Sequence, residues 1–150
     1  MKLFLNFILI SYIFFISNIS NALETSAKQA ILIDSNSKQV LFAKNENEKI
    51  SPASLTKIMT AAVVFELIKK GEIKLDDKFI ISTKAWRMSK QGYSSMFIMP
   101  NDKITVENLL KGIIVASGND ACIALAEGVA GTESNFATLM NDMAKRIGMD

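Results

Sequence analysis

The stretch that decides the fold of this chain is Ser51-Pro52-Ala53-Ser54-Leu55-Thr56-Lys57-Ile58-Met59-Thr60-Ala61. Its proline stands where helices favour one, near the first turn, and mostly apolar residues continue as far as Ile68. Gly71 then gives the signal of a helix C-terminus, so we expect a helix over roughly residues 53–70. Because that helix is apolar nearly all round, we expect it to be buried rather than to lie on the surface.

Ser54 and Lys57 lie three residues apart and therefore share one face of the expected helix. Burial makes an unpaired ammonium expensive and so favours the neutral amine. A neutral amine beside a hydroxyl is a general base beside a nucleophile. A purely structural alternative remains open at this point: Ser54 caps the N-terminus of the helix, and the ammonium group of Lys57 reaches solvent.

A second Ser-x-x-Lys match occurs at Ser35-Asn36-Ser37-Lys38. It lies in a polar run between two apolar runs, which is typical of a turn. A lysine in a turn is solvated and protonated, so it cannot act as a base. The pattern alone therefore does not identify a catalytic pair; the sequence around it does.

Residues 1–22 have the features of a secretory signal peptide. Lys2 supplies a positive start, an apolar run follows, and Ser20-Asn21-Ala22 ends in small residues that suit cleavage after Ala22. The alternative is an uncleaved membrane anchor, although the apolar run falls short of the ~20 residues of a spanning helix. Either reading predicts export, to the periplasm or to the outer face of the cytoplasmic membrane.

Composition excludes several function classes. The charges nearly balance, with 17 basic and 15 acidic residues, so nothing indicates nucleic acid as a partner. The sequence contains no histidine, which excludes a Ser-His-Asp triad and histidine-ligated metal within this chain. The single cysteine, Cys122, lies in an apolar helical stretch and is expected to be a small core residue. Lysine is then the obvious candidate for a base.

The rest of the chain predicts a mixture of strands and helices. Two apolar runs at 30–33 and 40–43 flank the polar turn and predict a hairpin. A further strand is expected at 78–81 and an irregular stretch at 82–103. Helices are expected at 106–116, capped by Thr105, at 121–129, and after Gly131 with the apolar stripe Phe136, Leu139, Met140, Met143 and Ile147. A lone hairpin is marginal in water, so the sheet needs more strands than this sequence obviously supplies.

Ser117-Gly118-Asn119 interrupts two of the expected apolar helices. A glycine-containing break of this kind presents one hydroxyl and one carboxamide to whatever the helices frame. Taken alone, the same three residues also make an ordinary turn between helices. Asp120, which follows, is expected to cap the next helix and is assigned no chemistry.

Together the two motifs resemble the serine acyl-transferases of the penicillin-binding group, and most of all the exported D-alanyl-D-alanine carboxypeptidases, the low-molecular-mass penicillin-binding proteins. The resemblance runs from about residue 25 to the last residue and is carried by Pro52 to Thr60, Ser94-Ser95-Met96-Phe97, Leu110-Lys111-Gly112-Ile113 and Ser117 to Cys122. It implies an α/β (α+β) fold of the penicillin-binding-protein and β-lactamase-like transpeptidase type. Residues 23–150 would be the N-terminal part of the catalytic domain.

The resemblance also implies roles for the matched residues. Ser54 would be the acylated nucleophile and Lys57 its base; Ser117 would relay protons to the leaving group, and Asn119 would orient the substrate amide and hold Lys57. The backbone N–H of Ser54 would form half of an oxyanion hole. The reaction would remove the terminal D-alanine from the peptidoglycan stem pentapeptide, and β-lactams would trap the same acyl-enzyme. No metal or organic cofactor is called for.

One element of the family is absent from the sequence: Lys-Thr-Gly, which in relatives lies downstream on a sheet strand and binds the substrate carboxylate. The resemblance therefore predicts an incomplete fold, with an N-terminal hairpin and a helical region but without the C-terminal sheet strands. Little or no activity is expected if the gene itself is shortened. The usual C-terminal amphipathic helix is also absent, so peripheral membrane association rests on analogy alone.

Two alternative functions remain open on the sequence. One is a β-lactamase-like hydrolase, although class A β-lactamases usually carry aspartate where this chain has Gly118. The other is a non-catalytic wall-binding remnant in which Ser54 is unreactive. Trp86, Tyr93 and Phe97 are expected to pack in the core or a lid rather than to line a substrate groove.

Overall fold

The computed structural model describes residues 23–149, so the expected signal peptide at 1–22 lies outside the described residues. The chain divides into two compact units, one ending at Ile50 and one beginning at Ser51. No helix in the part of the chain that the structure describes is long and apolar enough to span a membrane.

The first unit is the predicted hairpin. Strands β1 (Ala30–Ile33) and β2 (Val40–Lys44) pair antiparallel, with Ala30 opposite Lys44 and an irregularity in register after Leu32. Most of its large apolar side chains are exposed, namely Ile31, Leu32, Ile33, Val40 and Leu41. A two-stranded ribbon has no second layer of its own, and this is why the hairpin buries so little.

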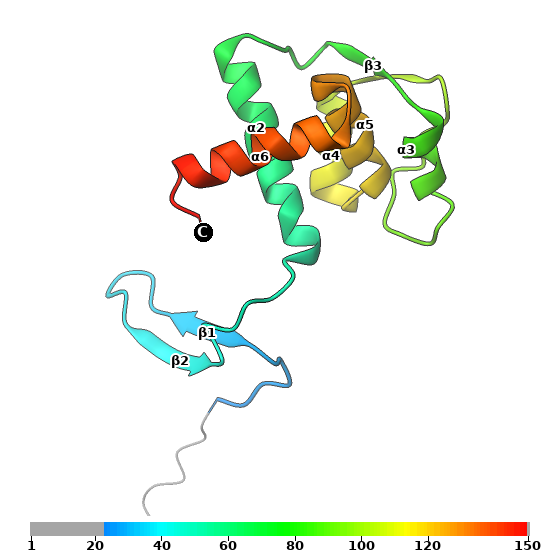
Figure 1. The fold of residues 1–150 in the computed structure, drawn as a ribbon. Helices are drawn as coiled ribbons and strands as arrows, with labels where there is room; N and C mark the ends of the chain where they lie inside the picture. Colours follow the sequence, from blue (N-terminus) through cyan, green and yellow to red (C-terminus); the bar gives the residue numbers. More distant parts are fainter. Residues whose placement is uncertain (1–22, 150) are drawn as a thin grey trace, which may run out of the picture. The chain divides into compact units, whose positions relative to one another are not determined.

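The second unit is mainly helical (Figure 1). The 3₁₀ turn η1 (Ala53–Leu55) leads into α2 (Thr56–Lys70); α3 (Thr83–Met88), α4 (Val106–Ala116), α5 (Asn119–Ala130) and α6 (Glu133–Arg146) follow, and the short strands β3 (Lys78–Ile80) and β4 (Lys103–Thr105) pair antiparallel. Helix α5 contacts α3, α4, α6 and β3, which makes it the central element of this unit. The largest fully buried apolar side chains come from α2, α4, α5 and the loop after β3: Val64, Ile81, Val106, Leu109 and Leu125.

Local signals explain where these helices begin and end. The Oγ1 atoms of Thr105 and Thr132 accept hydrogen bonds from the N–H groups of Asn108 and Asn135, at 3.2 Å and 3.1 Å. Such caps stabilise a helix by about 1 kcal/mol each. Helix α2 ends at Gly71, whose φ of 76° is left-handed and suits glycine. The predicted cap at Thr105 is confirmed.

Two expectations about this unit were wrong in detail. Residues 82–103 are not all irregular: Ser82 caps α3 by accepting from the N–H of Ala85 at 3.0 Å, and β4 forms just before α4. The third long helix starts at Asn119 rather than Ala121, so the break between helices is shorter than expected.

Helix α2 is not buried on all sides, contrary to expectation. Thr60, Val63 and Val64 are buried, whereas Ile58 is 68% exposed and Phe65 50% exposed. The reason is that α2 packs against α4, α5 and α6, and within the second unit no described element covers the face that carries Ile58 and Phe65.

Candidate active site

The four residues singled out in the sequence lie in or at the end of four elements of the second unit. Ser54 lies in η1 and Lys57 in the first turn of α2. Ser117 is the residue at which α4 ends, and Asn119 is the first residue of α5. The structure therefore brings the two motifs, some 60 residues apart in sequence, to one place.

Three polar atoms form a close triangle at this place. Lys57 Nζ donates to Ser117 Oγ at 2.9 Å and to Ser54 Oγ at 3.4 Å, and Ser117 Oγ donates to Ser54 Oγ at 3.3 Å. Lys57 Nζ also donates to the backbone carbonyl of Ser117 at 2.6 Å. Lys57 is half-buried and spans the gap between α2 and the end of α4, so it does not simply reach solvent.

Backbone geometry at both sides of the triangle is unusual. Ala53 and Ser117 have φ values of 47° and 52°, in the left-handed region that side chains other than glycine rarely adopt. Each such residue costs of the order of 1–3 kcal/mol, and such strain clusters at functional sites. The left-handed turn at Ser117 ends α4 and leaves both its carbonyl and its hydroxyl in contact with Lys57.

Asn119 lies beside the triangle without touching it. Its Nδ2 donates to the carbonyl of Ser94 at 3.1 Å, and its backbone N–H donates to the same oxygen at 2.8 Å. No hydrogen bond between Asn119 and Lys57 is found among the described residues; the contacts of Lys57 are to Ser117 and Ser54.

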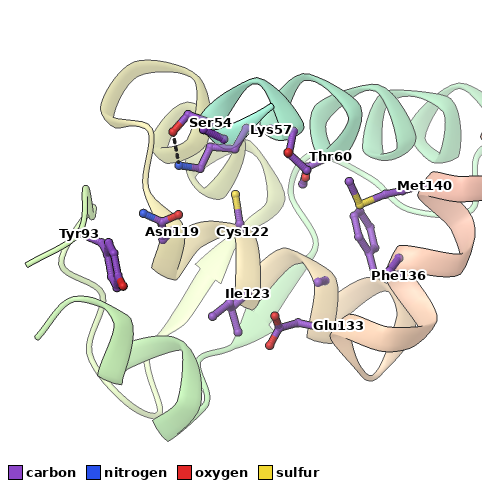
Figure 2. Close-up of a pocket in the computed structure, with 14 residues that line it drawn as sticks. Ser54, Lys57, Thr60, Tyr93, Asn119, Cys122, Ile123, Glu133, Phe136 and Met140 are labelled. Carbon is purple, nitrogen blue, oxygen red and sulfur yellow. Dashed lines mark hydrogen bonds between the residues drawn. The ribbon is translucent and has the colours of Figure 1, made fainter. Parts of the chain in front are cut away.

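Two cavities meet at Ser54 and Lys57. One, of about 470 Å³, extends toward α5 and α6 and includes Asn119, Tyr93 and Cys122 (Figure 2). The other, of about 460 Å³, lies between α2 and α4 and is largely apolar, with Ile58, Ala61, Ala62, Phe65, Ile113 and Ile114 in its wall. The nucleophile candidate is thus open to ligands from both sides.

Two residues that line the first cavity, Tyr93 and Cys122, were not expected there. Tyr93 was expected to pack in the core or a lid rather than to line a groove, but it is 56% exposed and lines the cavity; Phe97 is also exposed. Cys122 packs against the core, as expected, but it also lines the cavity. Burial raises the pKa of the Cys122 thiol to about 11, so the thiolate is scarce at neutral pH.

Asp120 was also misjudged. It does not cap α5, because the capping position is Gly118 and no side chain fills that role. Its side chain is instead fully buried and accepts hydrogen bonds from the N–H groups of Met96 and Ile98. An acidic residue within an otherwise apolar helical stretch was the only signal in the sequence that could have drawn attention to it.

The second Ser-x-x-Lys match forms no comparable site. Asp34 accepts hydrogen bonds from the backbone N–H and the hydroxyl of Ser37, at 2.6 Å and 2.7 Å, and Lys38 is exposed with a left-handed φ of 61°. The predicted turn is confirmed. Among the described residues no cluster of three or more acidic, cysteine or histidine side chains could hold a metal ion.

Comparison with known proteins identifies the family of the chain. Residues 16–150 match the model of peptidase family S11, described as D-alanyl-D-alanine carboxypeptidase. The chain is 44% identical over 130 residues to D-alanyl-D-alanine carboxypeptidase DacF of Bacillus subtilis, which covers 87% of this chain and 33% of the relative. It is 47% identical over 126 residues to DacC of Escherichia coli, covering 82% and 32%.

Solved structures give the same result. Penicillin-binding protein 5 of Haemophilus influenzae superposes with a TM-score of 0.78 at 38% identity, over 87% of this chain and 38% of that one. The carboxypeptidase DacD of Francisella tularensis gives 0.74 at 41% identity, over 85% and 30%. The described elements therefore have the expected penicillin-binding-protein fold, and the chain spans about a third of the length of the curated relatives it matches. This chain belongs to the D-alanyl-D-alanine carboxypeptidase family of serine peptidases.

Proposed function

We propose that the protein is a serine-type D-alanyl-D-alanine carboxypeptidase that acts through an acyl-enzyme on Ser54. The observation that carries the proposal is the triangle of Ser54 Oγ, Lys57 Nζ and Ser117 Oγ, whose three sides are 3.4, 2.9 and 3.3 Å long. These distances are within or close to the range in which a proton passes between heavy atoms.

Lys57 acts as the general base. A protonated lysine has three N–H groups and no lone pair, and its contacts to Ser54 and to the two oxygens of Ser117 use all three. The neutral amine keeps two donors for Ser117 and frees a lone pair that faces Ser54 Oγ. Lys57 in this form takes the Ser54 proton as the oxygen attacks the carbonyl carbon of the penultimate D-alanine.

The developing oxyanion is stabilised at the start of α2. Ser54 lies in the first turn of the helical segment, where backbone N–H groups have no partner inside the helix and the helix dipole favours negative charge. Its N–H supplies one donor of the oxyanion hole. Each donor of this type is worth about 3 kcal/mol of barrier.

Ser117 and Asn119 complete the reaction. Ser117 Oγ bridges Lys57 and the incoming substrate, and it passes the proton to the nitrogen of the departing D-alanine. Asn119 has a second N–H and a carbonyl oxygen left over from its bond to Ser94, and these bind the backbone amide of the substrate. Water then hydrolyses the acyl-enzyme and releases the shortened stem peptide.

The proposed activity implies two kinds of partner, the peptidoglycan stem peptide and β-lactams. An exported location, in the periplasm or on the outer face of the cytoplasmic membrane, fits both this substrate and the apolar start of the sequence. Peripheral membrane association is proposed only by analogy with the family. The chemistry requires no cofactor, because lysine and serine supply every proton transfer.

The test is release of D-alanine from an N-acylated Lys-D-Ala-D-Ala peptide by the protein as its gene encodes it. The wild type is expected to release D-alanine and Ser54→Ala to release none. A matched peptide that ends in D-Ala-L-Ala is expected to remain intact. If the wild type leaves the D-Ala-D-Ala peptide intact, or if Ser54→Ala retains activity, the proposed function is wrong.

A further inference from the structure

The inference concerns Asp120, an acidic residue whose side chain is completely buried. It lies in the first turn of α5, directly after Asn119, and its neighbours in the core are apolar. Burying a carboxyl group is costly unless hydrogen bonds replace the water that it loses. The partners of Asp120 should therefore reveal why it is there.

Those partners lie far away in the sequence. Oδ1 accepts from the backbone N–H of Met96 at 3.0 Å, and Oδ2 accepts from the N–H of Ile98 at 3.3 Å. The N–H of Ala121, next in the chain, also donates to Oδ1 at 2.9 Å. The two oxygens of one carboxyl group thus hold alternate residues of a segment more than 20 positions earlier.

The preceding residue holds the other end of the same segment. The carbonyl of Ser94 accepts from both the backbone N–H and the side-chain amide of Asn119. Four hydrogen bonds therefore hold residues 94–98: Asn119 donates two of them, and Asp120 accepts the other two. These residues follow Tyr93, which lines the cavity that contains Ser54 and Asn119 (Figure 2).

Close packing leaves this segment little room to shift. A Cβ atom on Gly118 would lie 2.9 Å from Asp120 Oδ1 and 3.3 Å from the backbone nitrogen of Met96. A Cβ atom on Gly112 would lie 2.3 Å from Met96 Sδ. The Met96 side chain is flexible and can move away from position 112, but position 118 faces a buried carboxylate and two backbone atoms. Glycine at 118 therefore lets the segment approach the start of α5 closely.

We propose that Asp120 is a positioning residue for substrate recognition. By binding the backbone of Met96 and Ile98, Asp120 fixes the position of the Ser94 carbonyl. That carbonyl orients the side-chain amide of Asn119. The same contacts fix the wall of the cleft that receives the acylamide part of a substrate. The inference rests on the proposed function, in which Asn119 binds that amide. Asp120 itself is buried and touches no substrate.

The experiment measures acylation by two β-lactams, benzylpenicillin, which carries an acylamide side chain, and 6-aminopenicillanic acid, which lacks it. In Asp120→Asn, the second-order rate constant for benzylpenicillin is expected to fall about 10- to 100-fold, since misplacement by about 1 Å costs this much. The constant for 6-aminopenicillanic acid is expected to fall much less. The ratio of the two constants does not depend on the fraction of molecules that are folded.

Two further variants complete the test. Asp102→Asn is the matched control, because Asp102 is exposed and its carboxylate accepts from one backbone N–H among the described residues, that of Met99 at 3.3 Å; it should leave the ratio unchanged. Gly112→Ala crowds the Met96 side chain but leaves the hydrogen bonds of Asp120 to the backbone in place, so it should lower the ratio less than Asp120→Asn does. Equal falls for both β-lactams, or an unchanged ratio in Asp120→Asn, would overturn the inference.

Amide hydrogen exchange separates this inference from the proposed function. Protection of the Met96 and Ile98 amides is expected in the wild type and is expected to be lost in Asp120→Asn but not in Asp102→Asn. A wild type that no β-lactam acylates would refute the proposed function and with it the recognition role. A wild type that is acylated, beside an Asp120→Asn variant with unchanged exchange and ratio, would refute the role of Asp120 alone.

Discussion

The chain contains the pattern Ser-x-x-Lys twice, at residues 35–38 and 54–57, and the two matches differ in secondary structure and in the contacts of their lysines. The first lies in a turn, where Ser37 binds Asp34 and Lys38 is exposed. The second lies at the start of a long helix, and a second element, the left-handed turn at Ser117, supplies two oxygens to Lys57. The same four-residue pattern therefore brings serine and lysine together only where a helix places them on one face and where a distant residue, here Ser117, binds the lysine.

The largest difference is expected from removing the two lysines. Lys57→Ala should slow acylation by benzylpenicillin by a factor of about 10² to 10⁴, the usual contribution of a general base. Lys38→Ala should leave the rate within experimental error, because Lys38 is exposed and lies in a turn. Stopped-flow or quenched-flow measurement of acyl-enzyme formation compares the two; similar rates would contradict the distinction between the sites.

The third group should have a smaller effect. Ser117→Ala removes the hydroxyl that contacts Lys57 and Ser54 but keeps the backbone carbonyl that accepts from Lys57 at 2.6 Å. We expect acylation to slow by about 10- to 100-fold, less than in Lys57→Ala, because part of the contact survives. Ser37→Ala is the control in the turn. An effect of Ser117→Ala as small as that of the control would remove Ser117 from the mechanism.

The thiol of Cys122 is a second potential nucleophile in the cavity that contains Ser54. Burial raises the pKa of Cys122 to about 11, so at pH 8 its thiolate is expected to be about a hundredfold scarcer than that of a free cysteine. Alkylation by iodoacetamide, followed by intact mass, should be slow at pH 8 and accelerate above pH 10. Labelling at the rate of free cysteine would mean that the thiol is not buried as described.

The smallest effect is expected in the turn itself. The backbone N–H and hydroxyl of Ser37 hold the pKa of the Asp34 carboxyl below its usual value of 3.8. The ionised form therefore stabilises the turn at neutral pH, and this contribution is lost as pH falls through the lowered pKa. Ser37→Ala should move the pKa of Asp34 upward in an NMR titration, with no change in acylation. An unchanged pKa would show that the Ser37 hydroxyl does not bind Asp34.

Much of the fold could be predicted because its signals are local. The hairpin, the cap at Thr105 and the long helices follow from alternation, periodicity and turn residues within a few positions. The exposure of Ile58 on α2 could not be predicted, because it depends on which elements pack against that helix. Helix α3 was missed although its cap, Ser82, is a local signal.

The candidate site divides in the same way. Ser54, Lys57, Ser117 and Asn119 stand in short motifs, and the sequence was enough to name them. Asp120 accepts hydrogen bonds from the backbone N–H groups of Met96 and Ile98. Every residue except proline has such a group, so the sequence does not indicate which ones Asp120 binds. Contacts between side chains and distant backbone groups are the part of such a site that sequence patterns do not express.

The most direct test of the central claim is the intact mass of the protein after incubation with a penicillin, in the wild type, Ser54→Ala and Ser35→Ala. We predict one covalent adduct on the wild type and on Ser35→Ala, and none on Ser54→Ala. An adduct that persists in Ser54→Ala would contradict the assignment of Ser54 as the nucleophile. So would a wild type that forms no adduct at all.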